Sequence, residues 1–169
     1  MRRVAKYGKS FEDYVEAIYL LEKSGVKVSV TSLARRLGVK PSSVVEQLKK
    51  LSEKKLIEYR RRGDIKLTNS GREYAQRIIE KHSILKRFLE NYLRVPNEIA
   101  DKDACSMEHY LHDITIERIL KFMSFIERIF KEDSYFAEKY REFLNEVSLS
   151  NIESNESINR NSEIFLNQK

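Results

Sequence analysis

Gly38 and Pro41 stand three residues apart between two short segments of helical pattern near the N-terminus. Glycine readily takes the left-handed backbone that ends a helix, and proline fits the first turn of the next one. The earlier segment begins at Thr31, a candidate N-cap. The later segment has apolar residues on one face, namely Val44, Val45, Leu48 and Leu51. This pattern predicts two helices joined by a short turn, which is a helix-turn-helix.

The regions on either side of this pair predict a winged helix. Ser10 is a candidate N-cap for a first helix over residues 10–24, and Gly25 is placed to end it. Residues 56–60 and 65–67 have the pattern of two short strands around a basic turn. In a winged helix the third helix enters the DNA major groove while the hairpin reaches phosphates. The expected fold class is mainly α, with an N-terminal winged helix-turn-helix domain over residues 1–72.

Positive charge is concentrated in the same part of the chain. The net charge is +6, but residues 1–66 hold 17 Lys and Arg against 8 Asp and Glu, and the remainder holds 15 against 18. A solvated, lysine-rich surface would explain the imbalance alone, whereas a helix-turn-helix beside it favours double-stranded operator DNA as the partner. The predicted contacts to bases are Ser42, Ser43, Glu46 and Gln47, and those to phosphates are Lys49, Lys50, Arg60, Arg61 and Arg62.

The second half of the chain predicts a helical bundle. Thr68 and Ser70 can cap a long helix whose apolar stripe includes His82, and Pro96 separates it from the next helix. Asp113 is placed to cap a further helix with more apolar residues than one helix can bury within the chain. We therefore expect residues 73–147 to form a helical dimerisation domain, so that the protein is a homodimer.

The ends of the chain and its single cysteine bear on its location. Residues 148–169 are rich in Asn and Ser, which predicts a flexible tail. One cysteine cannot form an internal disulfide, which is typical of a reducing compartment. The N-terminus has no apolar run of the length that a signal peptide or membrane helix needs. We expect a cytoplasmic protein that has no membrane partner.

Residues 105–112 concentrate possible metal ligands. Cys105, Glu108, His109 and His112 stand at i, i+3, i+4 and i+7, which is one face of a helix. Further candidates lie on two other predicted helices, namely Asp13, Glu16 and His82.

Each of the further candidates has a simpler explanation by itself. Asp13 can complete a capping box, Glu16 can be an exposed carboxylate and His82 a core histidine. In combination, carboxylates and imidazoles suit first-row divalent ions. The thiolate moves the preference toward Fe(II), Co(II), Ni(II) or Zn(II) and away from Mn(II).

Five short stretches, in order and at the right spacing, resemble the family of metal-dependent repressors that includes the diphtheria toxin repressor and the manganese transport regulator. These stretches are residues 11–19, 41–44, 67–71, 81–82 and 105–109 followed by Asp113. The resemblance covers residues 10 to about 130. It implies a winged helix, a helical dimerisation domain and Fe(II) or Mn(II) as corepressor. From the donor set we also expect that Zn(II), Co(II) or Ni(II) can bind in vitro.

The resemblance also implies a metal-site role for particular residues, which are Asp13, Glu16, His82, Cys105, Glu108 and His109. Asp13 and Glu16 are similar to the manganese-responsive branch, whereas Cys105 is similar to the iron-responsive branch. Lys86 and Asp101 replace a carboxylate and a histidine of the iron-responsive branch, so its ancillary site is expected to be altered. Residues 131–169 lack strand patterning, which is typical of the shorter members without an SH3-like domain.

Two other functions remain open from the sequence. A winged-helix regulator could instead sense an organic ligand or oxidation at Cys105. A helical-bundle metalloenzyme would need paired Glu-x-x-His motifs, whereas Glu108 and His109 are adjacent. The chain also has neither a nucleophile paired with a base nor a glycine-rich phosphate loop, so we expect that it is not an enzyme.

Overall fold

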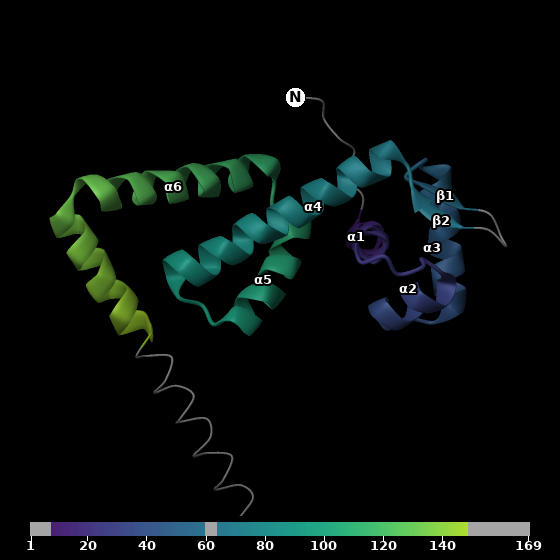
Figure 1. The fold of residues 1–169 in the computed structure, drawn as a ribbon, viewed down its shortest axis with the longest axis horizontal. Helices are drawn as coiled ribbons and strands as arrows, with labels where there is room; N and C mark the ends of the chain where they lie inside the picture. Colours follow the sequence, from purple (N-terminus) through teal and green to yellow (C-terminus); the bar gives the residue numbers. More distant parts are fainter. Residues whose placement is uncertain (1–7, 60–63, 149–169) are drawn as a thin grey trace, which may run out of the picture. The chain divides into compact units, whose positions relative to one another are not determined.

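The computed structural model describes residues 8–59 and 64–148. The chain divides into two compact units (Figure 1). The first consists of Met1–His82 with Glu108–Tyr110, and the second of Ser83–Met107 with Leu111–Lys169. The predicted domain ranges 1–72 and 73–147 stay predictions, and the expected tail lies outside the described residues except at Ser148.

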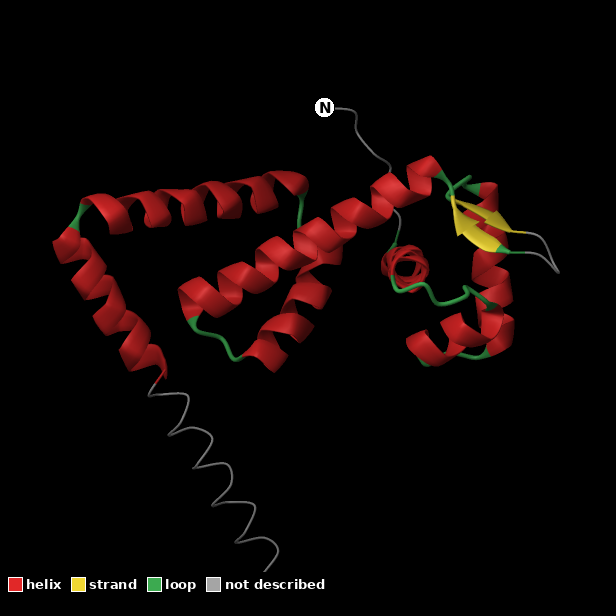
Figure 2. Cartoon of the chain, viewed as in Figure 1, coloured by secondary structure: helices red, strands yellow, loops and turns green. Residues whose placement is uncertain are grey.

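The first unit is a winged helix, as predicted. Its elements are α1 (Lys9–Lys23), α2 (Val30–Leu37), α3 (Pro41–Glu53), β1 (Ile57–Tyr59), β2 (Ile65–Leu67) and the first part of α4 (Asn69–Arg87). β1 and β2 pair antiparallel, with Ile57 opposite Leu67 and Tyr59 opposite Ile65. They are the only strands in the part of the chain that the structure describes (Figure 2).

A single apolar core holds the first unit together. The fully buried side chains include Ile18 of α1, Leu33 of α2, and Val44, Leu48 and Leu51 of α3. Residues 44, 48 and 51 recur at helical spacing, so α3 turns one face to this core and leaves the other exposed. Each such side chain contributes about 1.5–3 kcal/mol through burial. The core fixes α3 against α1 and α2.

Several helix ends follow the predicted chemistry. Gly38 closes α2 with φ of 65°, and Pro41 is the first residue of α3. Thr68 precedes α4 and its Oγ1 accepts a hydrogen bond from the backbone N–H of Gly71 at 3.0 Å. These positions depend on local geometry alone, which explains why they were predictable.

Other predicted caps are wrong by one or two residues. Ser10 lies inside α1, whose N-cap is Gly8. Ser29 rather than Thr31 caps α2, because Ser29 and Ser32 exchange hydrogen bonds in a capping box. Asp113 is the first residue of α6 (Asp113–Glu132), and the carbonyl of His112 accepts the first hydrogen bonds of that helix.

The second unit is helical, which completes the predicted fold class. It contains the end of α4, a π-helical turn η1 (Phe88–Tyr92), most of α5 (Asn97–Tyr110), α6, and a further helical stretch over 134–148. Leu85, Leu89, Ala100, Ala104 and Ile116 form one buried cluster, and Tyr92, Met123 and Ile126 form another. Among the described residues, no helix is both long and apolar enough to cross a membrane.

The residues predicted to alter an ancillary site form an ion pair in this unit. Lys86 Nζ lies 2.7 Å from Asp101 Oδ1. Hydrogen bonding to Asp101 raises the pKa of Lys86, so that its ammonium group stays charged. The positive charge beside Asp101 is thus supplied by the Lys86 ammonium group.

Candidate functional site

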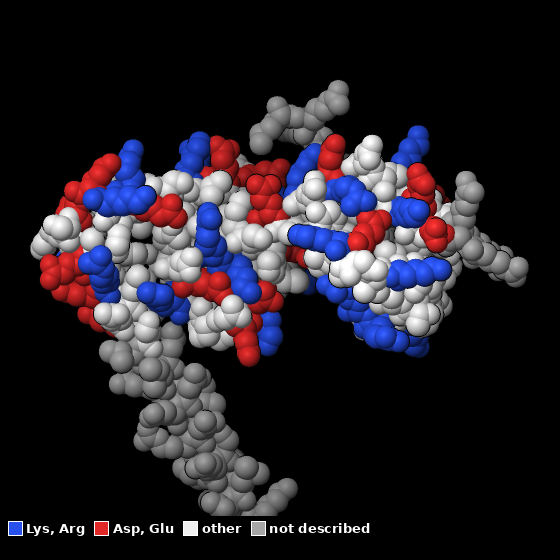
Figure 3. All heavy atoms as spheres, viewed as in Figure 1, with Lys and Arg blue, Asp and Glu red and all other residues white. Residues whose placement is uncertain are grey.

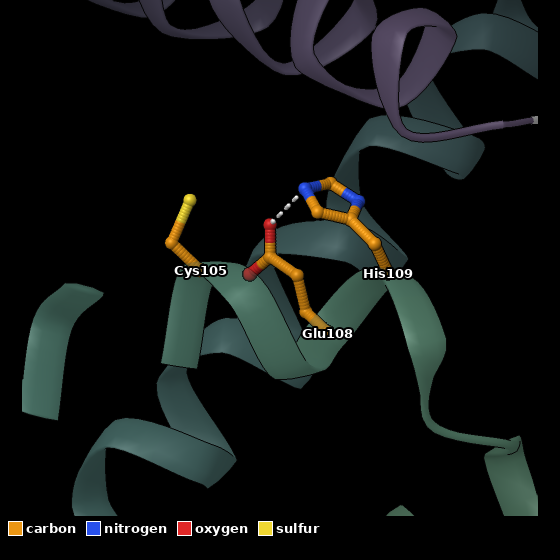
Figure 4. A group of neighbouring side chains, drawn as sticks. All are labelled: Cys105, Glu108 and His109. Carbon is orange, nitrogen blue, oxygen red and sulfur yellow. Dashed lines mark ion pairs between the residues drawn. The ribbon is translucent and has the colours of Figure 1, made fainter. Parts of the chain in front are cut away.

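The candidate metal centre is built around two buried polar residues at the end of α5. Glu108 and His109 have only 2% and 4% of their surface exposed. Figure 4 shows Cys105, Glu108 and His109 rising from the same helix, with the Glu108 carboxylate directed toward the His109 ring. Buried polar groups need partners. The surroundings of these two residues therefore indicate what the site can bind.

The acceptor atoms of three side chains face one another. His109 Nε2 lies 3.2 Å from Asp13 Oδ1 and 3.4 Å from Glu108 Oε1. The other oxygen of Glu108 lies 2.9 Å from Nδ1 of His82, which α4 supplies. Ligand candidates from α1, α4 and α5 thus converge.

Two atoms at the centre of this group lack a hydrogen bond. Within residues 8–59 and 64–148, no hydrogen-bond partner satisfies Glu108 Oε1 or His109 Nε2, although both atoms are buried. An unsatisfied buried polar atom costs about 1–3 kcal/mol. A divalent cation between them would satisfy both, because carboxylate oxygens and a neutral imidazole nitrogen are metal ligands. The residues present therefore fit a metal ion.

The electrostatics agree with a cation site. Burial lowers the pKa of His109, but its hydrogen bond with Glu12 and the charges of Glu108 and Asp13 outweigh this effect and raise the pKa. Burial raises the pKa of Glu16, as do the charges of Glu108 and Asp13, while both histidines oppose that rise. Positive charge is thus favoured at this place.

Cys105 and Glu16 complete the predicted set in different ways. The Cys105 sulfur, a Glu108 oxygen and a His109 nitrogen lie within 4.8 Å of one another, one helical turn of α5 bringing them together. Glu16 is half-buried and is connected to the group through its electrostatic interactions. His112 does not share this face, because α5 ends at Tyr110 and His112 is exposed before α6.

The sequence did not identify Glu12 as part of the centre. Its side chain is buried in α1, where Oε2 lies 2.5 Å from His109 Nδ1 and Oε1 accepts a hydrogen bond from the Tyr74 hydroxyl. The sequence signal for Glu12 was its position three residues before Val15, which places an acidic side chain on the apolar face of α1. A carboxylate there needs a buried partner.

The candidate DNA contacts on α3 fall into two groups. Ser42, Ser43, Glu46, Lys49 and Lys50 are exposed. Lys50 Nζ lies 2.6 Å from Glu46, so part of the Glu46 charge is offset. Gln47 is half-buried and its amide donates to the Ser10 hydroxyl at 3.1 Å, toward α1. Arg60, Arg61 and Arg62 lie outside the described residues.

Three further cations were not predicted as contacts. Arg35 and Arg36 of α2 and Lys40 in the turn are exposed. Figure 3 shows Lys and Arg side chains gathered over α2. The first helix of a helix-turn-helix crosses the DNA backbone, so cations on its polar face are candidates for phosphate contacts. The available sequence signal was their position in the first helix of the helix-turn-helix and in the turn that follows it.

Models of two protein domains match most of the chain. The model described as iron dependent repressor, N-terminal DNA binding domain matches residues 6–65. The model described as iron dependent repressor, metal binding and dimerisation domain matches residues 68–133.

Individual proteins are similar over the same region. A helix-turn-helix-type transcriptional regulator of Methanocaldococcus jannaschii, MJ0568, is 39% identical over 116 residues, which are 68% of this chain and 93% of that protein. The transcriptional regulator MntR of Geobacillus kaustophilus is 32% identical over 133 residues, covering 79% and 91%. A solved manganese-dependent transcriptional repressor in complex with manganese has a TM-score of 0.62 and 33% identity over 68% of this chain. The chain spans about half, 53%, of that structure's length.

Proposed function

Because the chain belongs to the family of iron-dependent repressors, we propose that it is a cytoplasmic homodimer whose affinity for operator DNA rises when Fe(II) or Mn(II) binds beside His109. The family consists of metal-dependent transcriptional regulators, which are not enzymes. The observation that carries the proposal is the buried pair of atoms His109 Nε2 and Glu108 Oε1, which lack hydrogen bonds within the residues that the structure describes. Nε2 lies 3.4 Å from Glu108 Oε1 and 3.2 Å from Asp13 Oδ1. The proposed ligands are Asp13, Glu16, His82, Cys105, Glu108 and His109.

The proposed coupling runs through α1. Asp13 and Glu16 lie on this helix, and the same helix contacts α3 through the Gln47–Ser10 hydrogen bond and the shared core. A cation held by ligands of α1 and α5 together restricts the positions that α1, and with it α3, can take. Coupling of about 1–3 kcal/mol would change operator affinity roughly 5- to 150-fold.

The donor set supports Fe(II) or Mn(II) as the physiological ion. Asp13, Glu16 and Glu108 supply the oxygen ligands that Mn(II) favours, whereas the Cys105 thiolate favours Fe(II), and also Co(II), Ni(II) and Zn(II). The similar repressor solved with manganese supports Mn(II). The cysteine is therefore the residue to vary when the two ions are compared.

Operator binding tests the function. Duplexes selected from a random pool in the presence of Mn(II) or anaerobic Fe(II) serve as probe, and fluorescence anisotropy gives the dissociation constant. We expect affinity to rise about 5- to 150-fold with either ion and to return to its starting value with chelator. We expect Cys105→Ala to weaken the response to Fe(II) more than the response to Mn(II). Equal operator affinity with metal and with chelator would favour a sensor of an organic ligand or of oxidation.

We propose that a second copy of the chain covers a second apolar face of α6. Ile114, Phe122 and Phe125 are 53%, 50% and 47% exposed, while Met123 and Ile126 of the same helix are buried. At 100° per residue the three exposed side chains share one face, which is distinct from the buried face. The matched metal-binding and dimerisation model covers this whole helix. An exposed apolar stripe within such a region fits a self-complementary interface.

Placing a charge on this face should separate the protomers. We expect Phe125→Asp to raise the dimer dissociation constant about 30-fold or more, since loss of a central aromatic contact costs about 2 kcal/mol or more. Sedimentation velocity over a range of concentrations measures the constant. Ser124→Asp adds the same charge on a different face and should leave the dimer intact. A dimer that tolerates Phe125→Asp would place the interface elsewhere.

A further inference from the structure

Glu12 is a buried carboxylate that the proposed ligand set does not use. It is 5% exposed and lies on α1 beside the proposed ligand Asp13. Its two oxygens have different partners, which are the Tyr74 hydroxyl of α4 and Nδ1 of His109 on α5, each at 2.5 Å. All three residues are buried and belong to the first unit. A row of hydrogen bonds thus runs from Tyr74 through Glu12 to the centre of the site.

The contact with Glu12 decides which nitrogen of His109 is available. An ionised carboxylate accepts hydrogen bonds and cannot donate them, so the nitrogen beside Glu12 Oε2 carries the proton. With the proton on Nδ1, the neutral ring offers its lone pair from Nε2. Nε2 is the atom that faces Asp13 and Glu108. Glu12 therefore turns the ligating nitrogen of His109 toward the other candidate ligands.

Tyr74 constrains Glu12 in turn. Its hydroxyl donates to Oε1, which leaves Oε2 for His109 and holds the plane of the carboxylate. The Tyr74 ring is 7% exposed and packs in the apolar core of the winged helix. Its helix, α4, begins two residues after β2 ends. The orientation of His109 is thus tied to the core of the DNA-binding fold.

We propose that Glu12 and Tyr74 are positioning residues of the metal centre, which set the ring orientation and the ligating nitrogen of His109. The proposal rests on the proposed metal-binding function. Hydrogen-bonded carboxylates behind ligating histidines generally change metal affinity about 10- to 100-fold when they are removed. A purely structural pair would instead stabilise the metal-free fold and leave metal affinity unchanged.

Titration of the full chain with Co(II), followed by visible absorption, separates these roles. We expect Glu12→Gln, which keeps the shape of the side chain and removes its charge, to weaken Co(II) binding about 10- to 100-fold and to shift the absorption bands. Tyr74→Phe removes one hydroxyl and should weaken binding in the same direction by a smaller factor. Tyr14→Phe is the matched control, because Tyr14 is also buried in the same core and is not one of the three residues that form this row. It should leave Co(II) affinity unchanged.

A second measurement reports on the ring itself. In the Zn(II)-loaded chain with ¹⁵N-labelled histidine, we expect a slowly exchanging Nδ1–H resonance for His109 that Glu12→Gln weakens or removes. Denaturant unfolding of each metal-free variant gives the structural contribution. Unchanged Co(II) affinity and an unchanged His109 resonance in Glu12→Gln would overturn this inference while the proposed function stands. Failure of the unsubstituted chain to bind Co(II), Mn(II) or Fe(II) would overturn both.

Discussion

Replacement of Glu108 by alanine is expected to abolish the metal response and leave the chain folded. The Glu108 carboxylate lies between two imidazoles, with Oε2 2.9 Å from His82 Nδ1 and Oε1 3.4 Å from His109 Nε2. Its removal takes away a proposed ligand as well as the negative charge that favours a cation. Loss of groups that only support a ligand costs 10- to 100-fold in affinity, so we expect more than about 100-fold for this residue.

Calorimetric titration with Mn(II) and operator anisotropy with and without Mn(II) measure the effect of Glu108→Ala. Metal-independent DNA binding should be unchanged, because α3 and its exposed face are unaltered. Asp103→Ala is the control, since it removes an exposed acid from the same helix. A Glu108→Ala variant that still binds Mn(II) with full affinity would remove Glu108 from the metal centre.

Replacement of Gly71 by alanine is expected to destabilise the winged helix by about 3 kcal/mol or more. A Cβ atom at residue 71 would lie 1.9 Å from the backbone oxygen of Leu56 and 2.9 Å from its carbonyl carbon. The Leu56 oxygen cannot move away cheaply, because it accepts hydrogen bonds from the backbone N–H and the hydroxyl of Thr68. Glycine is required here so that α4 can approach Leu56, which directly precedes β1.

Denaturant unfolding followed by circular dichroism measures the loss. Gln76→Ala is the matched control, because it also places alanine in α4, at an exposed position, and should change stability by less than about 0.5 kcal/mol. An unfolding midpoint of Gly71→Ala equal to that of the unsubstituted chain would show that α4 can move away from Leu56 at low cost.

The order of elements in the first unit was predictable because each boundary depends on chemistry within a few residues. Gly38 ends α2 through its left-handed backbone, and Pro41 opens α3. The caps at Ser10 and Thr31 were mispredicted for a related reason. Ser29, Thr31 and Ser32 lie close together at the start of α2, whereas Ser10 is the first serine or threonine of the chain although Gly8 is the N-cap of α1. In both helices the capping residue depends on which carbonyl accepts the first backbone hydrogen bond.

The ligand candidates were identifiable for the same local reason. Asp13 and Glu16 are one turn apart on α1, and on α5 Cys105 lies one turn before the adjacent pair Glu108 and His109. Helical periodicity places each set on one face of its helix, but it does not identify the residues of other helices that this face contacts. For Gln47, periodicity predicted a residue pointing away from the core, whereas its amide reaches Ser10, 37 residues earlier.

The sequence by itself determined the winged-helix order, the helical second half and the kinds of atom that a metal could bind. Only the tertiary structure decided that Nε2 of His109 faces Asp13 and Glu108 while Nδ1 faces Glu12. The contact between His109 and Glu12 joins residues 97 positions apart. Side-chain periodicity within one helix carries no information about such a pair, because the pairing arises from the way α1, α4 and α5 pack.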